Sequence, residues 1–113
     1  MDGVIVSNHG GRQVDGAIAA LDALPPIVDA VGSDMSVLFD SGIRSGADIA
    51  KALAVGADAV LIGRPYLWGL ALDGQAGVEA VLRMLLAELD LTLALSGYTR
   101  PSELSRASLE PAQ

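Results

Sequence analysis

The segment Gly3-Val4-Ile5-Val6-Ser7-Asn8-His9-Gly10-Gly11 joins a short apolar run directly to a polar, glycine-rich turn. The same pairing recurs twice, as residues 36–39 followed by Asp40-Ser41-Gly42 and as residues 59–62 followed by Gly63-Arg64-Pro65. None of the three runs alternates between polar and apolar residues, which is typical of parallel strands that are covered on both faces. We therefore expect three parallel strands, each ending in a turn that can carry chemistry.

Each expected strand is followed by a segment with helical signals. A proline follows Leu24 and disfavours α conformation there, so the first helix is predicted over residues 25–32. Ser45 is a suitable N-cap for a second helix over about residues 47–55. Apolar residues at helical spacing predict a third helix over residues 77–95. Three successive strand–helix pairs indicate an α/β fold with right-handed crossovers.

The chain is too short for a closed barrel of parallel strands and helices. A (β/α)8 barrel needs eight strand–helix units in about 250 residues, and this chain has 113 residues. A sheet of three parallel strands also leaves two bare edges, which natural proteins avoid. The pattern alone predicts part of a barrel or a minimal doubly wound sheet over residues 1–97. Residues 98–113 are predicted to be a C-terminal tail that is ordered only where another surface receives it.

Composition excludes several classes of function. The net charge is -7 and Lys51 is the one lysine, which argues against nucleic acid as a partner. The chain has no cysteine and one histidine, so neither a disulfide framework nor a conventional metal site is expected. No apolar run has the length needed to span a bilayer, and the N-terminus has no basic leader. We therefore expect a cytoplasmic protein without membrane insertion.

The turn after the first expected strand carries the strongest chemical signal. His9 can act as a general base near neutral pH. Arg12 offers a planar guanidinium that matches a carboxylate in a bidentate pair. Gly10 and Gly11 have no Cβ, so a flat ring or a substrate can approach the backbone closely. A lone histidine at a strand end is more often structural than catalytic, but this one belongs to a constellation over residues 7–16.

The turns after the second and third expected strands combine glycine with arginine. Backbone N–H groups near Gly42 and Gly63 can point at a phosphate, and Arg44 and Arg64 can neutralise it. Alternatively, these arginines could pair with acids on the surface. Taken alone, the two turns indicate only a broad class of phosphate-binding barrels, which includes the nucleotide dehydrogenases.

The segment Ser7-Asn8-His9-Gly10-Gly11-Arg12-Gln13-Val14-Asp15-Gly16 resembles the active-site signature of the FMN-dependent α-hydroxy-acid dehydrogenases and oxidases. That family includes glycolate oxidase, lactate oxidase, lactate monooxygenase and mandelate dehydrogenase. Residues 39–46 and 62–66 resemble its turns after barrel strands seven and eight, in the same order and spacing. The resemblance implies that residues 1–97 are the C-terminal portion, about strands six to eight with their helices, of a TIM (β/α)8 barrel.

The same resemblance implies a function. It indicates an FMN-dependent oxidoreductase that oxidises a small, lactate-like L-2-hydroxy acid to a 2-oxo acid or its decarboxylated product. His9 would be the catalytic base and a substrate contact, and Arg12 would hold the substrate carboxylate. The residues implied to bind FMN are Ser7, Asp40, Ser41, Gly42, Ile43, Arg44, Gly63 and Arg64.

Two features of the chain, a departure from the family pattern and its short length, lead to expectations about its branch of the family and its activity. Ser41 stands where the family more commonly has glycine, and with the last helix it favours the lactate 2-monooxygenase branch. We expect the chain to be a truncated piece of a homo-oligomeric enzyme, with little or no activity and at best weak FMN binding of its own. Two alternatives remain. One is a non-catalytic half-barrel that self-associates through its bare edges, and the other is part of a different phosphate-binding barrel enzyme, which gives no reason for His9 and Arg12.

Overall fold

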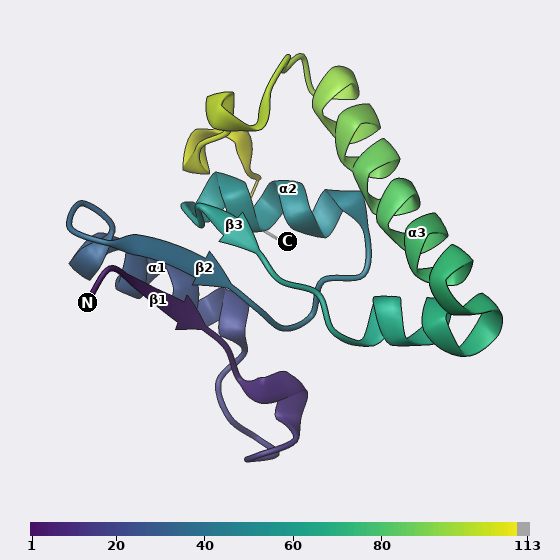
Figure 1. Cartoon of the computed structure of the whole chain (residues 1–113). Coiled ribbons are helices and arrows are strands. Elements are labelled where there is room, and N and C mark those ends of the chain that lie inside the picture. The colour runs from purple at the N-terminus through teal and green to yellow at the C-terminus, as the bar shows by residue number, and fades with distance from the viewer. Residues whose placement is uncertain (111–113) are drawn as a thin grey trace.

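The computed structural model describes residues 1–110 and contains a three-stranded parallel sheet (Figure 1). The strands are β1 (Gly3–Val6), β2 (Ser36–Phe39) and β3 (Ala59–Val60), and they lie side by side in the order β1-β2-β3. Both strand pairs are parallel, so the carboxyl ends of all three strands meet at one edge. The prediction of three parallel strands is confirmed.

The third strand is shorter than predicted. Residues 59–62 were expected to be extended, but β3 ends at Val60. The backbone N–H of Leu61 still donates to the Phe39 carbonyl at 2.8 Å. Ile62, which follows Leu61, has no strand residue beside it, because β2 ends at Phe39. The chain therefore leaves the sheet two residues early.

The first helix, α1 (Ala20–Val31), begins five residues before the predicted start at Pro25. Pro25 and Pro26 both lie inside it, although proline cannot donate a backbone hydrogen bond. The early start brings Ala20 and Leu24 into the core, where they are 5% and 0% exposed. Burial of these side chains offsets the missing hydrogen bonds, which the local proline signal did not take into account.

The second helix, α2 (Gly46–Val55), matches its prediction to within one residue. The Ser45 hydroxyl accepts from the Asp48 backbone N–H at 3.2 Å, and the Asp48 carboxylate accepts from the Ser45 N–H at 3.0 Å. This reciprocal arrangement is a capping box, so the predicted N-cap is confirmed.

The third helix, α3 (Arg64–Leu95), contains the predicted helix over residues 77–95 as its second arm. The helix breaks at Asp73 and Gly74, where the backbone leaves helical geometry, and Figure 1 shows a short first arm turning into a long second one. Gly69 and Gly77 bring the two arms into backbone contact, because a Cβ on Gly77 would overlap the Gly69 carbonyl.

The core lies between the sheet and its helices. Val37 and Phe39 of β2 are 0% and 2% exposed and belong to one apolar cluster with Leu24 of α1. Leu85, Leu89 and Leu93 of α3 are buried in the same cluster, and α3 packs along α2. Ile5 of β1, by contrast, is 53% exposed. The predicted α/β layers are therefore present, with part of β1 left uncovered.

The described part of the expected tail folds back onto the same chain. Arg106 forms an ion pair with Asp29 of α1 at 2.8 Å and donates to the carbonyls of Val55 and Pro25 at 3.1 and 3.2 Å. Helices α1 and α2 thus provide the receiving surface for residues 98–110. Residues 111–113 of that tail lie outside the described residues. Within residues 1–110, no helix combines the length and the apolarity needed to cross a bilayer.

Candidate functional site

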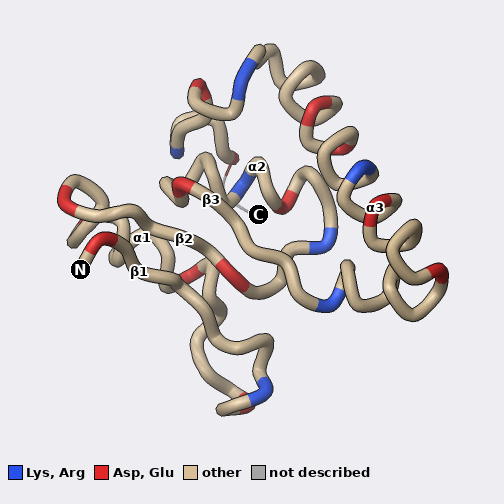
Figure 2. Tube along the Cα trace, viewed as in Figure 1, with Lys and Arg blue, Asp and Glu red and all other residues tan. Residues whose placement is uncertain are grey.

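A cavity of about 190 Å³ lies at the carboxyl ends of the three strands. Residues from the turns after all three strands surround it, as expected where parallel strands end at one edge. An arginine follows each strand, at positions 12, 44 and 64, and Figure 2 marks such positions in blue. The lining residues are His9, Gly10, Arg12, Asp40, Ser41, Gly42, Ile43, Leu61, Ile62, Gly63 and Arg64.

The turn after β1 holds the exposed His9 in a left-handed backbone conformation. The φ angles of His9, Gly10 and Gly11 are 56°, 63° and 76°. Left-handed backbone is uncommon for a residue with a side chain, so neighbouring groups must hold His9 there. The His9 N–H donates to the Ser7 hydroxyl at 3.0 Å, and the Gly10 N–H donates to the Asn8 side-chain oxygen at 3.0 Å. The turn is therefore fastened partly by its own side chains.

Two guanidinium groups converge on Gly10. Arg64 donates to the Gly10 carbonyl at 3.1 Å. A Cβ at Gly10 would lie 2.7 Å from an Arg64 nitrogen and 3.5 Å from an Arg12 nitrogen. The one carboxylate among the lining residues, Asp40, accepts a hydrogen bond from the Ser41 hydroxyl at 2.8 Å. Two positive groups and one negative group make the cavity suited to an anion.

The start of α3 adds backbone donors to the same cavity. Gly63 is the N-cap of α3 and has no side-chain cap, so the first N–H groups of the helix have no capping partner. Pro65 follows at the start of the helix and lacks an N–H, which leaves Gly63 and Arg64 as the donors beside the cavity. Backbone N–H groups at the positive end of a helix, together with a guanidinium, form a site that fits a phosphate group.

Arg44 lies apart from the other predicted phosphate ligands. Its guanidinium carbon is 5.3 Å from the centroid of the Trp68 ring, and one nitrogen donates to the Ile43 carbonyl at 2.6 Å. Stacking on an indole face and a carbonyl partner both stabilise this orientation. Arg44 is not among the residues that line the cavity.

Eight of the ten predicted site residues line the cavity, and Ser7 and Arg44 do not. The Ser7 hydroxyl instead accepts from the His9 N–H and lies 3.5 Å from the Ser41 hydroxyl. Sequence reasoning did not assign Leu61 or Ile62 to the site, although both line the cavity. Their apolar character predicted strand, and the signal that could have found them was their position immediately before the glycine turn at Gly63.

Comparison with known proteins agrees with the family resemblance seen in the sequence. A family model described as FMN-dependent dehydrogenase matches residues 1–111. The chain is 64% identical over 108 residues to an FMN-dependent alpha-hydroxy acid dehydrogenase of Schizosaccharomyces pombe, covering 94% of this chain and 26% of that protein. It is 58% identical over 106 residues to an L-lactate oxidase of Nostoc, covering 94% of this chain and 29% of that protein.

The fold is similar to that of a solved structure as well. A soluble mutant of the membrane-associated (S)-mandelate dehydrogenase from Pseudomonas putida superposes with a TM-score of 0.94 at 50% identity. The match covers 98% of this chain and 31% of that chain. The chain thus spans less than a third of the length of each of these three proteins. Because that dehydrogenase is membrane-associated, a cytoplasmic location stays a prediction here.

Proposed function

The chain belongs to the family of FMN-dependent dehydrogenases, and from that premise we propose that it forms part of the active site of an enzyme that oxidises a small L-2-hydroxy acid. This family consists of hydroxy-acid oxidoreductases that use FMN as their cofactor. One observation carries the proposal: His9 and Arg12, from the turn after β1, and Arg64, from the start of α3, line one cavity.

The architecture of the whole enzyme is part of this proposal. We take β1, β2 and β3 with their helices as the last three units of a (β/α)8 barrel, with 98–110 as an addition that packs outside them. The parallel sheet, its exposed Ile5 and the likeness to (S)-mandelate dehydrogenase support this reading. In such barrels the active site lies at the carboxyl ends of the strands, which is where the cavity lies.

Arg12 and His9 have complementary roles toward a 2-hydroxy acid. Arg12 would pair with the substrate carboxylate, because its planar guanidinium can donate two parallel hydrogen bonds to the carboxylate oxygens. His9 would take up the proton that leaves the substrate as C2 is oxidised from an alcohol to a ketone. When bound, FMN supplies the two-electron oxidation itself. Both side chains belong to the same turn and line the same cavity, so they can act on one small molecule.

The phosphate group of the cofactor would be bound by the donors after β2 and at the start of α3. Arg64 and the backbone N–H groups of Gly42 and Gly63 are the donors available there. The apolar side chains of Leu61 and Ile62 line the same cavity and can pack against the cofactor. Arg44 would contribute only after its guanidinium leaves the Trp68 ring.

We propose a substrate with a short side chain, as in lactate. The L-lactate oxidase of Nostoc supports this choice, whereas the likeness to (S)-mandelate dehydrogenase supports a larger, aromatic substrate. The activity is proposed for the enzyme of which this chain is a part. For the chain alone we expect weak, saturable FMN binding and slow flavin reduction.

The test measures cofactor binding and substrate oxidation separately. FMN is titrated into the chain and followed by flavin fluorescence, and L-lactate, D-lactate or (S)-mandelate is then added without oxygen while flavin absorbance is recorded. Of the three compounds, we expect only L-lactate to reduce the bound flavin. In a His9→Gln variant that still binds FMN, we expect no flavin reduction. Equal reduction rates in the two proteins would contradict the role of His9. Binding of a purine nucleotide in place of FMN would instead favour the nucleotide-dehydrogenase alternative.

A further inference from the structure

Ser41 has a backbone conformation that residues with side chains usually avoid. Its φ angle is 90°, and Ser41 and His9 are the non-glycine residues with positive φ in the described chain. Such conformations persist where surrounding contacts hold them, and they cluster at functional sites. Both residues line the same cavity, although they are 32 positions apart in the sequence.

The Ser41 hydroxyl connects the turn after β2 to the turn after β1. It donates to the Asp40 carboxylate at 2.8 Å, and its oxygen accepts from the backbone N–H groups of Asn8 and Gly10, each at 3.3 Å. A hydroxyl has one donor and two acceptor positions, so these three partners can occupy all of them. The Ser7 hydroxyl lies beside it as well, with the two hydroxyl oxygens 3.5 Å apart. The Asp40 carboxylate fixes where the hydroxyl proton points and leaves both lone pairs for the other turn.

We propose that Ser41 is the positioning residue for His9. Asn8 and Gly10 are the chain neighbours of His9 on either side, and both of their N–H groups converge on one oxygen. The backbone of His9 is thereby held from both sides in its left-handed conformation. The inference rests on the proposed function, in which His9 is the base, and it adds a residue from another strand end that acts through it.

The two tethered N–H groups differ in a way that makes the proposal testable. The Gly10 N–H has a second acceptor, the Asn8 side-chain oxygen at 3.0 Å. The Asn8 N–H has Ser41 as its acceptor among the described residues. Loss of the Ser41 hydroxyl should therefore leave the Asn8 N–H without an acceptor, whereas the Gly10 N–H keeps its bond to the Asn8 side chain. The Gly11 N–H, which donates to the Asn8 carbonyl at 3.0 Å, depends on Ser41 only indirectly.

The experiment is amide hydrogen exchange by NMR on the chain and on three variants, Ser41→Ala, Ser41→Gly and the control Ser36→Ala. Ser36 is an exposed serine whose hydroxyl has no partner among the described residues. In both Ser41 variants we expect exchange at Asn8 to accelerate about fivefold to tenfold, as for the loss of one ordinary hydrogen bond. Gly10 should change less, and the buried amide of Val37 should not change. The control should leave all three rates as they are.

The two Ser41 variants distinguish the effect of losing the hydroxyl from the effect of relieving the backbone strain. Glycine adopts positive φ freely, so Ser41→Gly removes the hydroxyl and the strain together, whereas Ser41→Ala removes only the hydroxyl. Equal acceleration at Asn8 in both variants supports the proposal. Unchanged exchange at Asn8 in both would overturn it, and so would acceleration in Ser41→Ala alone. A general acceleration that includes Val37 in Ser41→Ala would indicate unfolding, and Ser41→Gly then decides.

A flavin measurement distinguishes this inference from the function on which it rests. In FMN-loaded protein, both Ser41 variants should slow the reduction of the bound flavin by L-lactate, since His9 would be displaced but present. Retained reduction alongside accelerated Asn8 exchange would show that the tether does not serve His9 and would overturn the proposal. If the parent chain binds no FMN, the proposed FMN site of this chain fails, and the Asn8 rates alone decide whether Ser41 holds the turn.

Discussion

The turns around the cavity and the close contacts of helices α2 and α3 use glycine for opposite purposes. In the turns, Gly11 and Gly42 have φ angles of 76° and 87°, and the space beside each is empty. Among the helices, Gly46 and Gly77 have ordinary helical backbones, but a Cβ on either would overlap backbone atoms of a neighbouring segment. Glycine in the turns permits an unusual conformation and leaves room for a ligand. Glycine in the helices permits close packing.

The stabilising interactions of the two regions differ in the same way. Polar groups hold the turns: the Ser41 hydroxyl donates to Asp40 and accepts from the Asn8 N–H, and these side chains are half-buried. Leu85 and Leu89, which are 3% and 8% exposed, stabilise the helical region. We therefore expect substitutions in the helices to change the free energy of unfolding, and substitutions in the turns to change ligand binding.

The largest effect is expected for Gly77→Ala. The added methyl group would overlap the Gly69 carbonyl, so the two arms of α3 would have to separate. Forced overpacking of this kind costs about 3 kcal/mol of unfolding free energy. Urea unfolding followed by circular dichroism measures the change. Gln75→Ala introduces the same residue at an exposed position two residues earlier, and its effect should stay within about 0.5 kcal/mol. Equal midpoints for the two variants would show that the arms of α3 can separate freely.

A smaller effect, on binding and not on folding, is expected for Arg64→Ala. Loss of a charge-assisted contact to phosphate should weaken FMN binding by about 2 kcal/mol, or roughly 30-fold in Kd. Flavin fluorescence titration measures it, and urea unfolding should be nearly unchanged because Arg64 is half-buried at the rim of the cavity. Arg83→Ala removes an arginine that pairs with Glu79 on the exposed side of α3, and it should bind FMN like the parent chain. Equal losses in the two variants would mean that net charge, and not the site, governs binding.

Much of this division into polar turns and packed helices could be predicted from sequence. The strand runs and the glycine turns after them are local signals, so β1, β2 and eight of the lining residues were found without the structure. The start of α1 was missed because the burial of Leu24 outweighs the local effect of Pro25, and burial depends on residues distant in sequence. The close contact of Gly69 and Gly77 was missed for the same reason, since only the break in α3 brings them together.

The placement of Arg44 shows the same limit within the site. Its sequence context predicts a phosphate ligand, yet in the structure its guanidinium stacks on Trp68, 24 residues later in the chain. No spacing rule connects a turn residue to the first arm of α3. Local patterns could therefore indicate which residues belong to the site, but not which way each side chain turns.

A third prediction tests the helical contact through a polar group. The Glu88 carboxylate of α3 accepts from the Gly46 N–H at the start of α2 at 2.8 Å, so it caps one helix from another. Glu88→Ala should cost about 1 kcal/mol of unfolding free energy, the usual value of a helix cap. Glu79→Ala removes an exposed glutamate from the same helix and should cost about 0.5 kcal/mol or less. If the two variants unfold at the same urea concentration, the contact between α2 and α3 depends on apolar packing alone.

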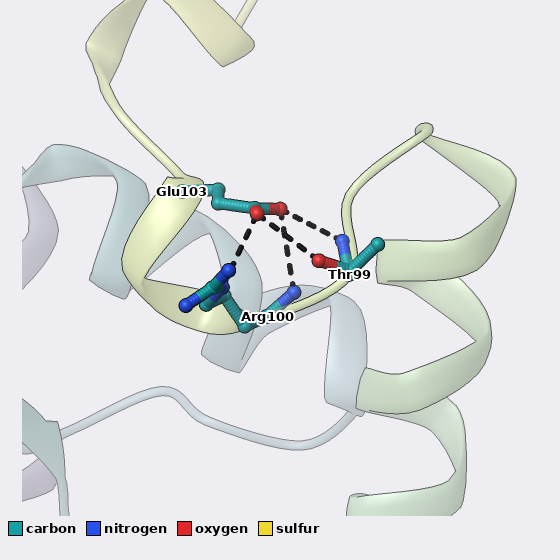
Figure 3. A network of polar contacts seen from close by, with 3 residues as sticks. All are labelled: Thr99, Arg100 and Glu103. Atoms are coloured by element: carbon teal, nitrogen blue, oxygen red, sulfur yellow. Dashed lines mark hydrogen bonds and ion pairs between the residues drawn. The ribbon is translucent and has the colours of Figure 1, made fainter.

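The smallest effect concerns a polar network outside both regions, and it depends on pH. Glu103 accepts from the backbone N–H and the hydroxyl of Thr99 at 2.8 and 3.0 Å and pairs with Arg100 (Figure 3). The hydrogen bonds from Thr99, and then those from Arg100, hold the pKa of Glu103 below its ordinary value of 4.5. The carboxylate therefore stabilises the folded chain fully above that value, and the contribution disappears as pH falls through the lowered pKa.

Urea midpoints of the parent chain and of Glu103→Gln, measured from neutral pH down to pH about 3, isolate this contribution. The parent should be the more stable of the two near neutral pH, and the difference should shrink below the ordinary pKa of the carboxyl group. Because Glu103 is solvent-exposed, salt should reduce the difference as well. A difference that does not vary with pH would mean that geometry, and not charge, makes the network stabilising.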